Sequence, residues 1–394
     1  MLASPYSPGS APLVLAGRRL QVEAAQADLA RVATFAGFVG RVRVDVGPRG
    51  VGKTSLLKAV RSHADEAGLV TAWVTARADE SLVASLVHAV GEGLDAIGVD
   101  VSKHRGLRDR LRTLTVEVGA GVVKAGAEVD VTRDGRPLGA ASAELGGFVV
   151  EASLQARKRG SAGLCLLVDE VQAAPLADLR TIAYAWQELQ DREPAPAAVL
   201  FAAGLPNAPD VLTSAVTFSE RFAFRTLQRL DPEAAAQALT LPAGLADVAW
   251  DDALVEAVVA RTEGYPYVLQ LYGDALWRAA APEVGDSLGV EHLAVAEEQV
   301  AGELDTMFRA RWSKATPGER RMLTAMSEVM DQDRGDTEQP VRRAEVAARM
   351  GVSSNDLSVP RRSLLDKGLV EVSGRGSLAF TTPGFAAFVR EESG

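Results

Sequence analysis

The chain has 394 residues, of which 47% are hydrophobic and 24% are charged, and its net charge at pH 7 is -10. Because this length exceeds that of one ordinary core, we expect two or three domains. The acidic balance argues against nonspecific coating of nucleic acid, so a DNA contact would need a local basic face.

Hydropathy and cysteine content indicate the compartment. No apolar run approaches the roughly 20 residues that span a bilayer, and the first residues lack a basic stretch followed by an apolar one. The single cysteine, Cys165, has no disulfide partner within the chain, and the four histidines show no metal-ligand spacing. We therefore expect a cytoplasmic protein with no membrane partner and no structural metal.

The N-terminal part predicts a tail, a helix and a strand. Residues 1–12 are rich in Ser, Pro and Ala and predict a flexible tail. Residues 15–19 then lead into a helical pattern through Glu23, Leu29 and Val32. Arg41 to Val46 reads as a strand because valines alternate along it. This helix and strand belong to the core domain, which we expect to cover residues 13–230.

The strand is followed by the segment GPRGVGKT, residues 47–54, which satisfies the phosphate-binding pattern G-x-x-x-x-G-K-[ST]. A helix is predicted from Ser55, so the segment has the strand, loop and helix context that the pattern requires. Backbone N–H groups of such a loop surround a phosphate, Lys53 would reach the β- and γ-phosphates, and the Thr54 hydroxyl would ligate Mg²⁺. The predicted nucleotide contacts are Gly47, Gly50, Val51, Gly52, Lys53, Thr54 and Ser55.

Strands and helices then alternate. Leu69 to Thr75 is a short apolar strand that precedes a helical pattern through Val90, which predicts an α/β fold with a parallel sheet. Residues from about 113 to 140 interrupt this alternation with glycines and a turn-rich loop, so we predict an inserted β-hairpin there. The insert either contacts a partner or is a structural excursion at the sheet edge.

The next strand ends in two acidic residues. Leu164 to Val168 is continuously apolar and runs into Asp169 and Glu170, as a strand buried on both faces does when its carboxyl end opens at a nucleotide site. Asp169 would hold Mg²⁺, directly or through water, and Glu170 would orient and polarise the attacking water.

Two further candidates follow along the chain. Asn207, soon after the strand Ala198 to Ala203, is either a sensor of the γ-phosphate or a turn residue beside Pro206. Arg221, directly before a predicted fifth strand, is either an arginine finger directed at a neighbouring subunit or a surface ion-pair residue.

The C-terminal part predicts a helical lid over residues 231–312 and a winged helix over residues 313–394. In the latter, helices are predicted at 343–350 and 358–367, before two short strands. Arg361 and Arg362 on the second of these helices and Arg375 at the wing tip would contact DNA, or else they are solvated surface charges.

Several motifs together resemble a known family. They are GPRGVGKTSLL, CLLVDEVQ, FAAGLPN, SERFAF, GYPYVLQLYGDALW, RWSKATPGERRML and RGSLAFTTPGF. In this order they resemble bacterial ATP-binding proteins whose AAA+ domain is similar to that of replication initiators and of STAND-type ATPases.

The resemblance implies ATP as the nucleotide, Mg²⁺ as its metal and homo-oligomers as the assembly. It also implies a lid held over the nucleotide by the turn Gly264-Tyr265-Pro266, with Pro266 as a nucleotide contact. It implies the phosphate-loop residues and Asp169 and Glu170 as nucleotide site, with Arg221 as the arginine finger. Two departures stand out: the lid helix after Pro266 lacks the usual sensor arginine, and the strand before Asn207 ends in Gly204 rather than in a polar residue.

Three functions remain open on the sequence. The first is an ATPase that switches between states and engages double-stranded DNA through the winged helix. The second is a transcriptional or defence regulator that binds ATP without hydrolysing it. The third uses the winged helix for protein contacts, because residues 340–382 carry only a modest excess of Arg and Lys over Asp and Glu.

Overall fold

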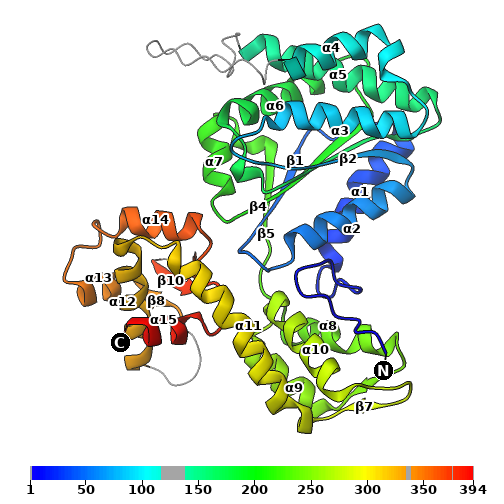
Figure 1. Ribbon diagram of the computed structural model, residues 1–394. Coiled ribbons are helices and arrows are strands. Elements are labelled where there is room, and N and C mark those ends of the chain that lie inside the picture. The colour runs from blue at the N-terminus through cyan, green and yellow to red at the C-terminus, as the bar shows by residue number, and fades with distance from the viewer. Residues whose placement is uncertain (1, 117–137, 334–338, 375, 394) are drawn as a thin grey trace. The chain divides into compact units, whose positions relative to one another are not determined.

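The computed structural model describes residues 2–116, 138–333, 339–374 and 376–393. The chain divides into two compact units (Figure 1). The sheet unit comprises Arg18–Val46 and Leu56–Thr226, and the helical unit comprises Met1–Gly17, Gly47–Ser55 and Leu227–Gly394.

The sheet unit is built on a five-stranded parallel sheet with the strand order β2-β3-β4-β1-β5. In chain order its strands are β1 (Val42–Val46), β2 (Leu69–Thr75), β3 (Gly163–Asp169), β4 (Ala198–Gly204) and β5 (Phe222–Thr226). The helices are α1 (Arg19–Phe35), α2 (Lys53–Glu66), α3 (Leu82–Ala96), α4 (Arg105–Val116), α5 (Leu138–Lys158), α6 (Leu176–Glu188) and α7 (Ala208–Ala215). The predicted α/β fold is confirmed.

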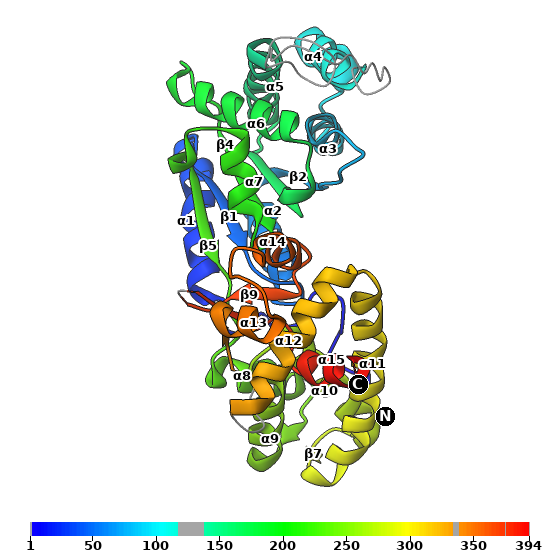
Figure 2. The ribbon, with the colours of Figure 1, turned by 90° about the vertical axis from the view of Figure 1, so that its left-hand side faces the viewer.

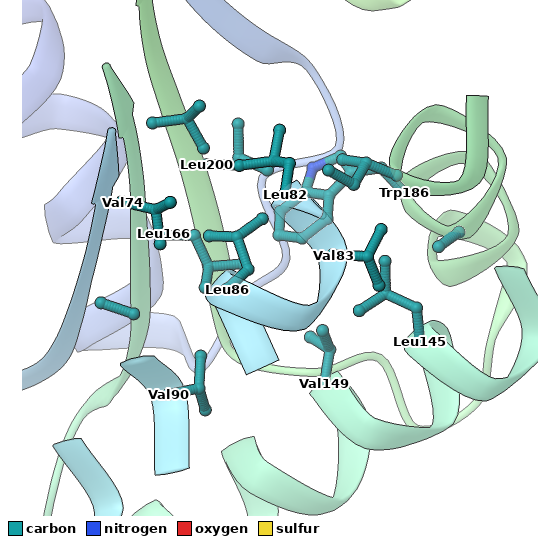
Figure 3. Packing of buried hydrophobic residues seen from close by; sticks show 14 of the residues in the cluster. Val74, Leu82, Val83, Leu86, Val90, Leu145, Val149, Leu166, Trp186 and Leu200 are labelled. Atoms are coloured by element: carbon teal, nitrogen blue, oxygen red, sulfur yellow. The ribbon is translucent and has the colours of Figure 1, made fainter. Parts of the chain in front are cut away.

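Helices cover both faces of this sheet, which is why its strands are so apolar. Successive side chains of a strand point to opposite faces, so Leu164, Leu166 and Val168 of β3 join one core cluster with residues of α3, α5 and α6. Cys165 and Leu167 join the other cluster, with α1 and α2. Figure 3 shows the first cluster, and Figure 2 shows α1 and α3 on opposite faces of the sheet.

The helical unit begins with four helices and a two-stranded sheet in the predicted lid region. They are α8 (Pro232–Gly244), β6 (Ala249–Trp250), α9 (Asp252–Thr262), α10 (Pro266–Ala280), β7 (Ser287–Leu288) and α11 (Leu293–Ser313). Asp231 caps α8 by accepting a hydrogen bond from the backbone N–H of Ala234 at 2.8 Å.

The N-terminal segment packs on these helices, which differs from the flexible tail predicted for residues 1–12. Tyr6 is only 3% exposed, and its ring contacts Trp250 and Trp277 edge-on, with centroids 6.1 and 6.0 Å apart. Its hydroxyl donates to the carbonyl of Leu239 and accepts from the Trp250 indole at 2.9 Å. The composition of this segment does not reveal the packing, because it depends on a few individual contacts, chiefly those of one aromatic side chain.

A third core holds the C-terminal residues together. Its elements are α12 (Pro317–Asp333), β8 (Val341–Arg342), α13 (Arg343–Met350), α14 (Ser358–Asp366), β9 (Val370–Val372), β10 (Ser377–Phe380) and α15 (Phe385–Ser393). The strands form an antiparallel sheet in the order β8-β10-β9. Helix, turn, helix and hairpin thus follow one another as the sequence predicted.

The predicted β-hairpin over residues 113–140 lies mostly outside the described residues, because the structure describes nothing between 117 and 137. Its described ends belong to the helices α4 and α5. Within the described ranges, no helix is long and apolar enough to cross a membrane.

Candidate nucleotide site

The predicted phosphate loop directly follows β1 and leads into α2, whose first residue is Lys53. Gly50 and Gly52 have φ angles of +84° and +97°, values that side-chain-bearing residues rarely adopt. Such turns direct successive backbone N–H groups to one side, and the helix N-terminus adds its own. Val51 is fully buried, Ser55 half-buried and Thr54 exposed in the first turn of α2. This loop fits a phosphate group.

The Lys53 side chain is folded into this loop. Its residue is 5% exposed, and its ammonium donates to the carbonyl oxygens of Gly47 and Pro48, both at 2.8 Å. An ammonium has three donors, and a buried one needs oxygen acceptors for them. The charge of Lys53 is therefore held inside the loop. The oxygens of a phosphate are hydrogen-bond acceptors, like the two carbonyl oxygens that Lys53 contacts.

The loop also contacts the turn at the start of α10. The Tyr265 hydroxyl donates to the carbonyl of Arg49, and the backbone N–H of Tyr267 donates to the carbonyl of Gly50 at 3.2 Å. A Cβ at position 50 would lie 3.0 Å from both the Tyr265 hydroxyl and the Tyr267 Cβ, which is tighter than an ordinary contact, and the φ of +84° would strain any other residue there. Pro266, predicted as a nucleotide contact, is the first residue of α10.

Tyr265 connects the loop to the C-terminal elements. It is fully buried, and the Thr382 hydroxyl donates to its oxygen at 3.5 Å. Arg311 of α11 donates to the Thr382 hydroxyl at 2.6 Å and also hydrogen-bonds Tyr265. Burial raises the pKa of Tyr265 and lowers that of Arg311. Sequence reasoning identified the turn but missed this tyrosine, whose only local signal is its place in Gly264-Tyr265-Pro266.

A second arginine completes the surroundings of Tyr265. The Arg229 guanidinium lies 5.8 Å from the centre of the Tyr265 ring, forms an ion pair with Glu263, and donates to the carbonyls of Phe380 and Thr381 at 3.3 and 3.4 Å. Arg229 and Arg311 therefore both bond to the end of β10 or the residues that follow it.

The acidic pair lies where the sequence predicted it, in the sheet unit. Asp169 is the last residue of β3 and is 4% exposed. Its Oδ1 accepts from the backbone N–H of Glu170 at 2.9 Å, and Glu170 turns the chain with a φ of +52°. Strands β3 and β1 are parallel and separated by β4 alone, so the acids and the start of the phosphate loop both follow carboxyl ends of the sheet.

The two remaining candidates in the sheet unit, Arg221 and Asn207, lie at opposite ends of the strands. Arg221 ends a short 3-10 turn just before β5, at the amino ends of the strands, and its guanidinium donates to the Gln190 side chain. Asn207 precedes α7 after the carboxyl end of β4, and its Oδ1 is buried with no hydrogen-bond partner in the described parts of the chain.

The predicted DNA contacts lie on α14. Arg361 is half-buried and Arg362 exposed, and the neighbouring Val359 is 80% exposed. Arg375, the third candidate, lies outside the described residues.

Comparison with known proteins gives one family match, at the C-terminal residues, and several similar structures. Residues 305–389 match a family described as "Domain of unknown function (DUF8462)", and no curated protein matches the chain. The chain is similar to the Walker-type ATPase paby2304 of Pyrococcus abyssi, with a TM-score of 0.58 and 12% identity over 95% of this chain and 96% of that one.

The Aeropyrum pernix ORC2 protein is a second similar structure. In its ADPNP-ADP complexes it matches with a TM-score of 0.58 and 15% identity over 98% of this chain and 95% of that one. In its ADP form the TM-score is 0.53, with 15% identity over 98% and 97%. Together with the five-stranded parallel sheet, these likenesses show that the chain has the α/β fold of these proteins, a parallel sheet with helices on both faces.

Proposed function

We propose that the protein is an Mg²⁺-dependent ATPase that works as a nucleotide-dependent switch. Its phosphate loop with a buried lysine and its acidic strand end supply the two parts that phosphoryl transfer needs, a cradle for the phosphates and a carboxylate for water. The fold shared with a Walker-type ATPase and with an ORC2 protein solved with ADPNP and ADP supports this proposal.

The residues take separate roles in this proposal. Lys53 compensates the charge of the β- and γ-phosphates, while Thr54 and Asp169 hold Mg²⁺, which when bound neutralises phosphate charge. Glu170 orients the attacking water and accepts its proton. Arg221 lies at the amino ends of the strands, and we propose that it contacts the γ-phosphate of the nucleotide bound to a neighbouring copy in a homo-oligomer.

The observation that carries the switch is the hydrogen-bonded series through Tyr265. Arg311 donates to Thr382, Thr382 donates to Tyr265, and Tyr265 donates to the phosphate loop at Arg49. A loop that changes shape on binding ATP changes the acceptor of the buried Tyr265 hydroxyl, and a buried hydroxyl without an acceptor is unfavourable by about 1–3 kcal/mol. ATP binding is thereby coupled to residues just after β10.

Removing this hydroxyl should uncouple the C-terminal domain from the nucleotide. In the wild type, we expect a nonhydrolysable ATP analogue to change hydrogen exchange in residues 377–382. In Tyr265→Phe we expect analogue affinity within a few-fold of the wild type but loss of that response, because the donor to Arg49 and the acceptor for Thr382 are both gone. Mass-spectrometric hydrogen exchange with and without analogue measures both states.

The matched control is Tyr272→Phe, a tyrosine on helix α10, whose first residue follows Tyr265; its side chain is also buried, but among the described residues it makes no hydrogen bond to the phosphate loop. It should respond as the wild type does. An unchanged response in Tyr265→Phe would refute the coupling route while leaving ATP binding intact.

We further propose that the C-terminal domain is a winged helix that binds double-stranded DNA through α14. The second helix of such a motif enters the major groove, and Arg361 and Arg362 are in the first turns of α14, beside the exposed Val359. Their charges would contact phosphates or base edges, with Arg375 of the wing expected on the backbone.

The double variant Arg361→Ala, Arg362→Ala should weaken duplex binding and reduce the slope of log K against log salt by about one to two phosphate equivalents. Fluorescence anisotropy over a salt titration measures this, and ATP affinity should not change. The control pair Arg309→Ala, Arg349→Ala removes the same charge from arginines that are ion-paired with Asp305 and Glu328.

If both double variants bind duplex like the wild type, or if the wild type binds none with either nucleotide, the winged helix is better assigned to protein contacts. A wild type that binds ATP and duplex without turnover would instead favour the regulator that uses ATP as a structural ligand.

A further inference from the structure

Gln172 forms a bridge between the ends of strands β3 and β4. After Glu170, the residues Val171–Ala173 form a single 3-10 turn, which brings the Gln172 side chain back beside Glu170. Its Nε2 donates to Glu170 Oε2 at 2.5 Å, and its Oε1 accepts from the backbone N–H of Leu205 at 2.9 Å. Both ends of one amide are thus used, one on the acidic motif and one on the residue after β4.

The partners fix which way the amide faces. The backbone N–H of Leu205 can only donate, so the Gln172 oxygen must face it. The amide NH₂ is then directed at Glu170, whose Oε2 accepts its hydrogen bond. A flipped amide would lose both hydrogen bonds, so the orientation that holds Glu170 is the stable one.

Gly204 makes the room that this bridge requires. A Cβ at position 204 would lie 2.7 Å from Gln172 Oε1 and 2.8 Å from the Cβ of Ala208. Neither distance is tolerated, so any other residue at this position would push the Gln172 amide away. The departure seen in the sequence, a strand that ends in glycine instead of a polar residue, therefore coincides with a polar side chain that arrives from the neighbouring strand.

We propose that Gln172 is the positioning residue of the ATPase reaction, which orients Glu170 and ties it to the end of β4; this rests on the proposed function. In hydrolysis, the water oxygen forms a bond to the γ-phosphorus as the bond from that phosphorus to the bridging oxygen breaks. The electron pair of the broken bond leaves with ADP, and the water proton passes to Glu170 and then to the released phosphate. By holding Oε2, Gln172 fixes the orientation of the Glu170 carboxylate.

The variant Gln172→Glu tests the orientation of Glu170 separately from the hydrogen bond that ties Gln172 to the end of β4. A glutamate still accepts from the Leu205 N–H, so the tie to β4 is kept, but it cannot donate to Glu170 and repels it. We expect kcat for ATP hydrolysis to fall about tenfold, with the affinity for a nonhydrolysable ATP analogue unchanged within twofold. Gln237→Glu is the matched control, because Gln237 donates to Glu233 on α8 in the same manner, and it should retain the wild-type kcat.

A double-mutant cycle with Glu170→Gln distinguishes positioning from a merely structural role. If Gln172 acts through Glu170, then Gln172→Glu should lower the residual rate of Glu170→Gln by less than twofold. A further tenfold loss in that background, or a wild-type kcat in Gln172→Glu alone, would overturn the inference while the proposed function stands.

Two checks keep the outcome decisive. Should Gln172→Glu melt well below the wild type, Gln172→Met, of similar shape, replaces it in both backgrounds. Because methionine makes neither hydrogen bond of the amide, the double-mutant cycle alone then decides whether Gln172 acts through Glu170. Should the wild type itself not hydrolyse ATP, the proposed function fails and the inference with it, an outcome distinct from a normal rate in the Gln172 variants.

Discussion

Lys53→Ala is expected to weaken ATP binding at least about a hundredfold. The wild-type ammonium is held inside the phosphate loop by the carbonyls of Gly47 and Pro48, so its charge is positioned before any nucleotide arrives. Each charge-assisted hydrogen bond to phosphate contributes about 1.5–3 kcal/mol, and two of them correspond to a hundredfold or more in Kd. Titration with a fluorescent ATP analogue measures the loss.

Lys58→Ala is the matched control, since Lys58 is an exposed lysine on the same helix. It should bind the analogue like the wild type. The melting temperature of Lys53→Ala should stay within a few degrees of the wild type, because its ammonium bonds to loop carbonyls rather than packing in an apolar core. Unchanged affinity in a folded Lys53→Ala variant would mean that the loop does not bind phosphate.

The features that sequence predicted well are local ones. The loop after β1 and the acids after β3 each follow a short apolar run, and both runs are strands of the sheet. The eight-residue motif is recognised by the spacing of its own residues, and the strand before it and the helix after it are adjacent in the chain, so its position in the fold follows from local sequence.

Burial by another element was harder to predict, as β1 shows. Its alternating valines predicted a strand, and all five residues of that strand are buried. Arg43 and Asp45 lie on the face opposite the valines and form an ion pair at 3.1 Å, and Arg43 also donates to the carbonyl of Gln21 in α1 at 2.7 Å. Burial lowers the pKa of Arg43 and raises that of Asp45. Sequence shows two charges, but only the packing of α1 makes them a buried pair.

Contacts between distant residues left no sequence pattern at all. Tyr265 and Arg49 are far apart in the chain, as are Gln172 and Leu205, so neither hydrogen bond follows from periodicity or spacing. The sequence did contain one indirect sign, the glycine at position 204 where the resemblance leads one to expect a polar residue. Its physical reason, the close approach of the Gln172 amide, needs the coordinates of both strand ends.

Glu170→Gln is expected to bind ATP but to hydrolyse it at least tenfold more slowly, a loss of about 1.4 kcal/mol or more of transition-state stabilisation. Glutamine has nearly the shape of glutamate and keeps an oxygen that accepts from Gln172, so the turn after β3 should be retained. What it lacks is a carboxylate that accepts the proton of water. Phosphate release under saturating ATP and analogue binding measure the two properties separately.

Glu151→Gln provides the control for that substitution. Glu151 likewise accepts from a glutamine, Gln155, at 2.7 Å, but it lies on α5 and not at a strand end of the sheet. The same change there should leave turnover at the wild-type value, so a loss confined to Glu170 would reflect its chemistry and not the charge removed. Wild-type turnover in Glu170→Gln would exclude Glu170 as the base, and absence of turnover in the wild type would favour a protein that uses ATP as a ligand alone.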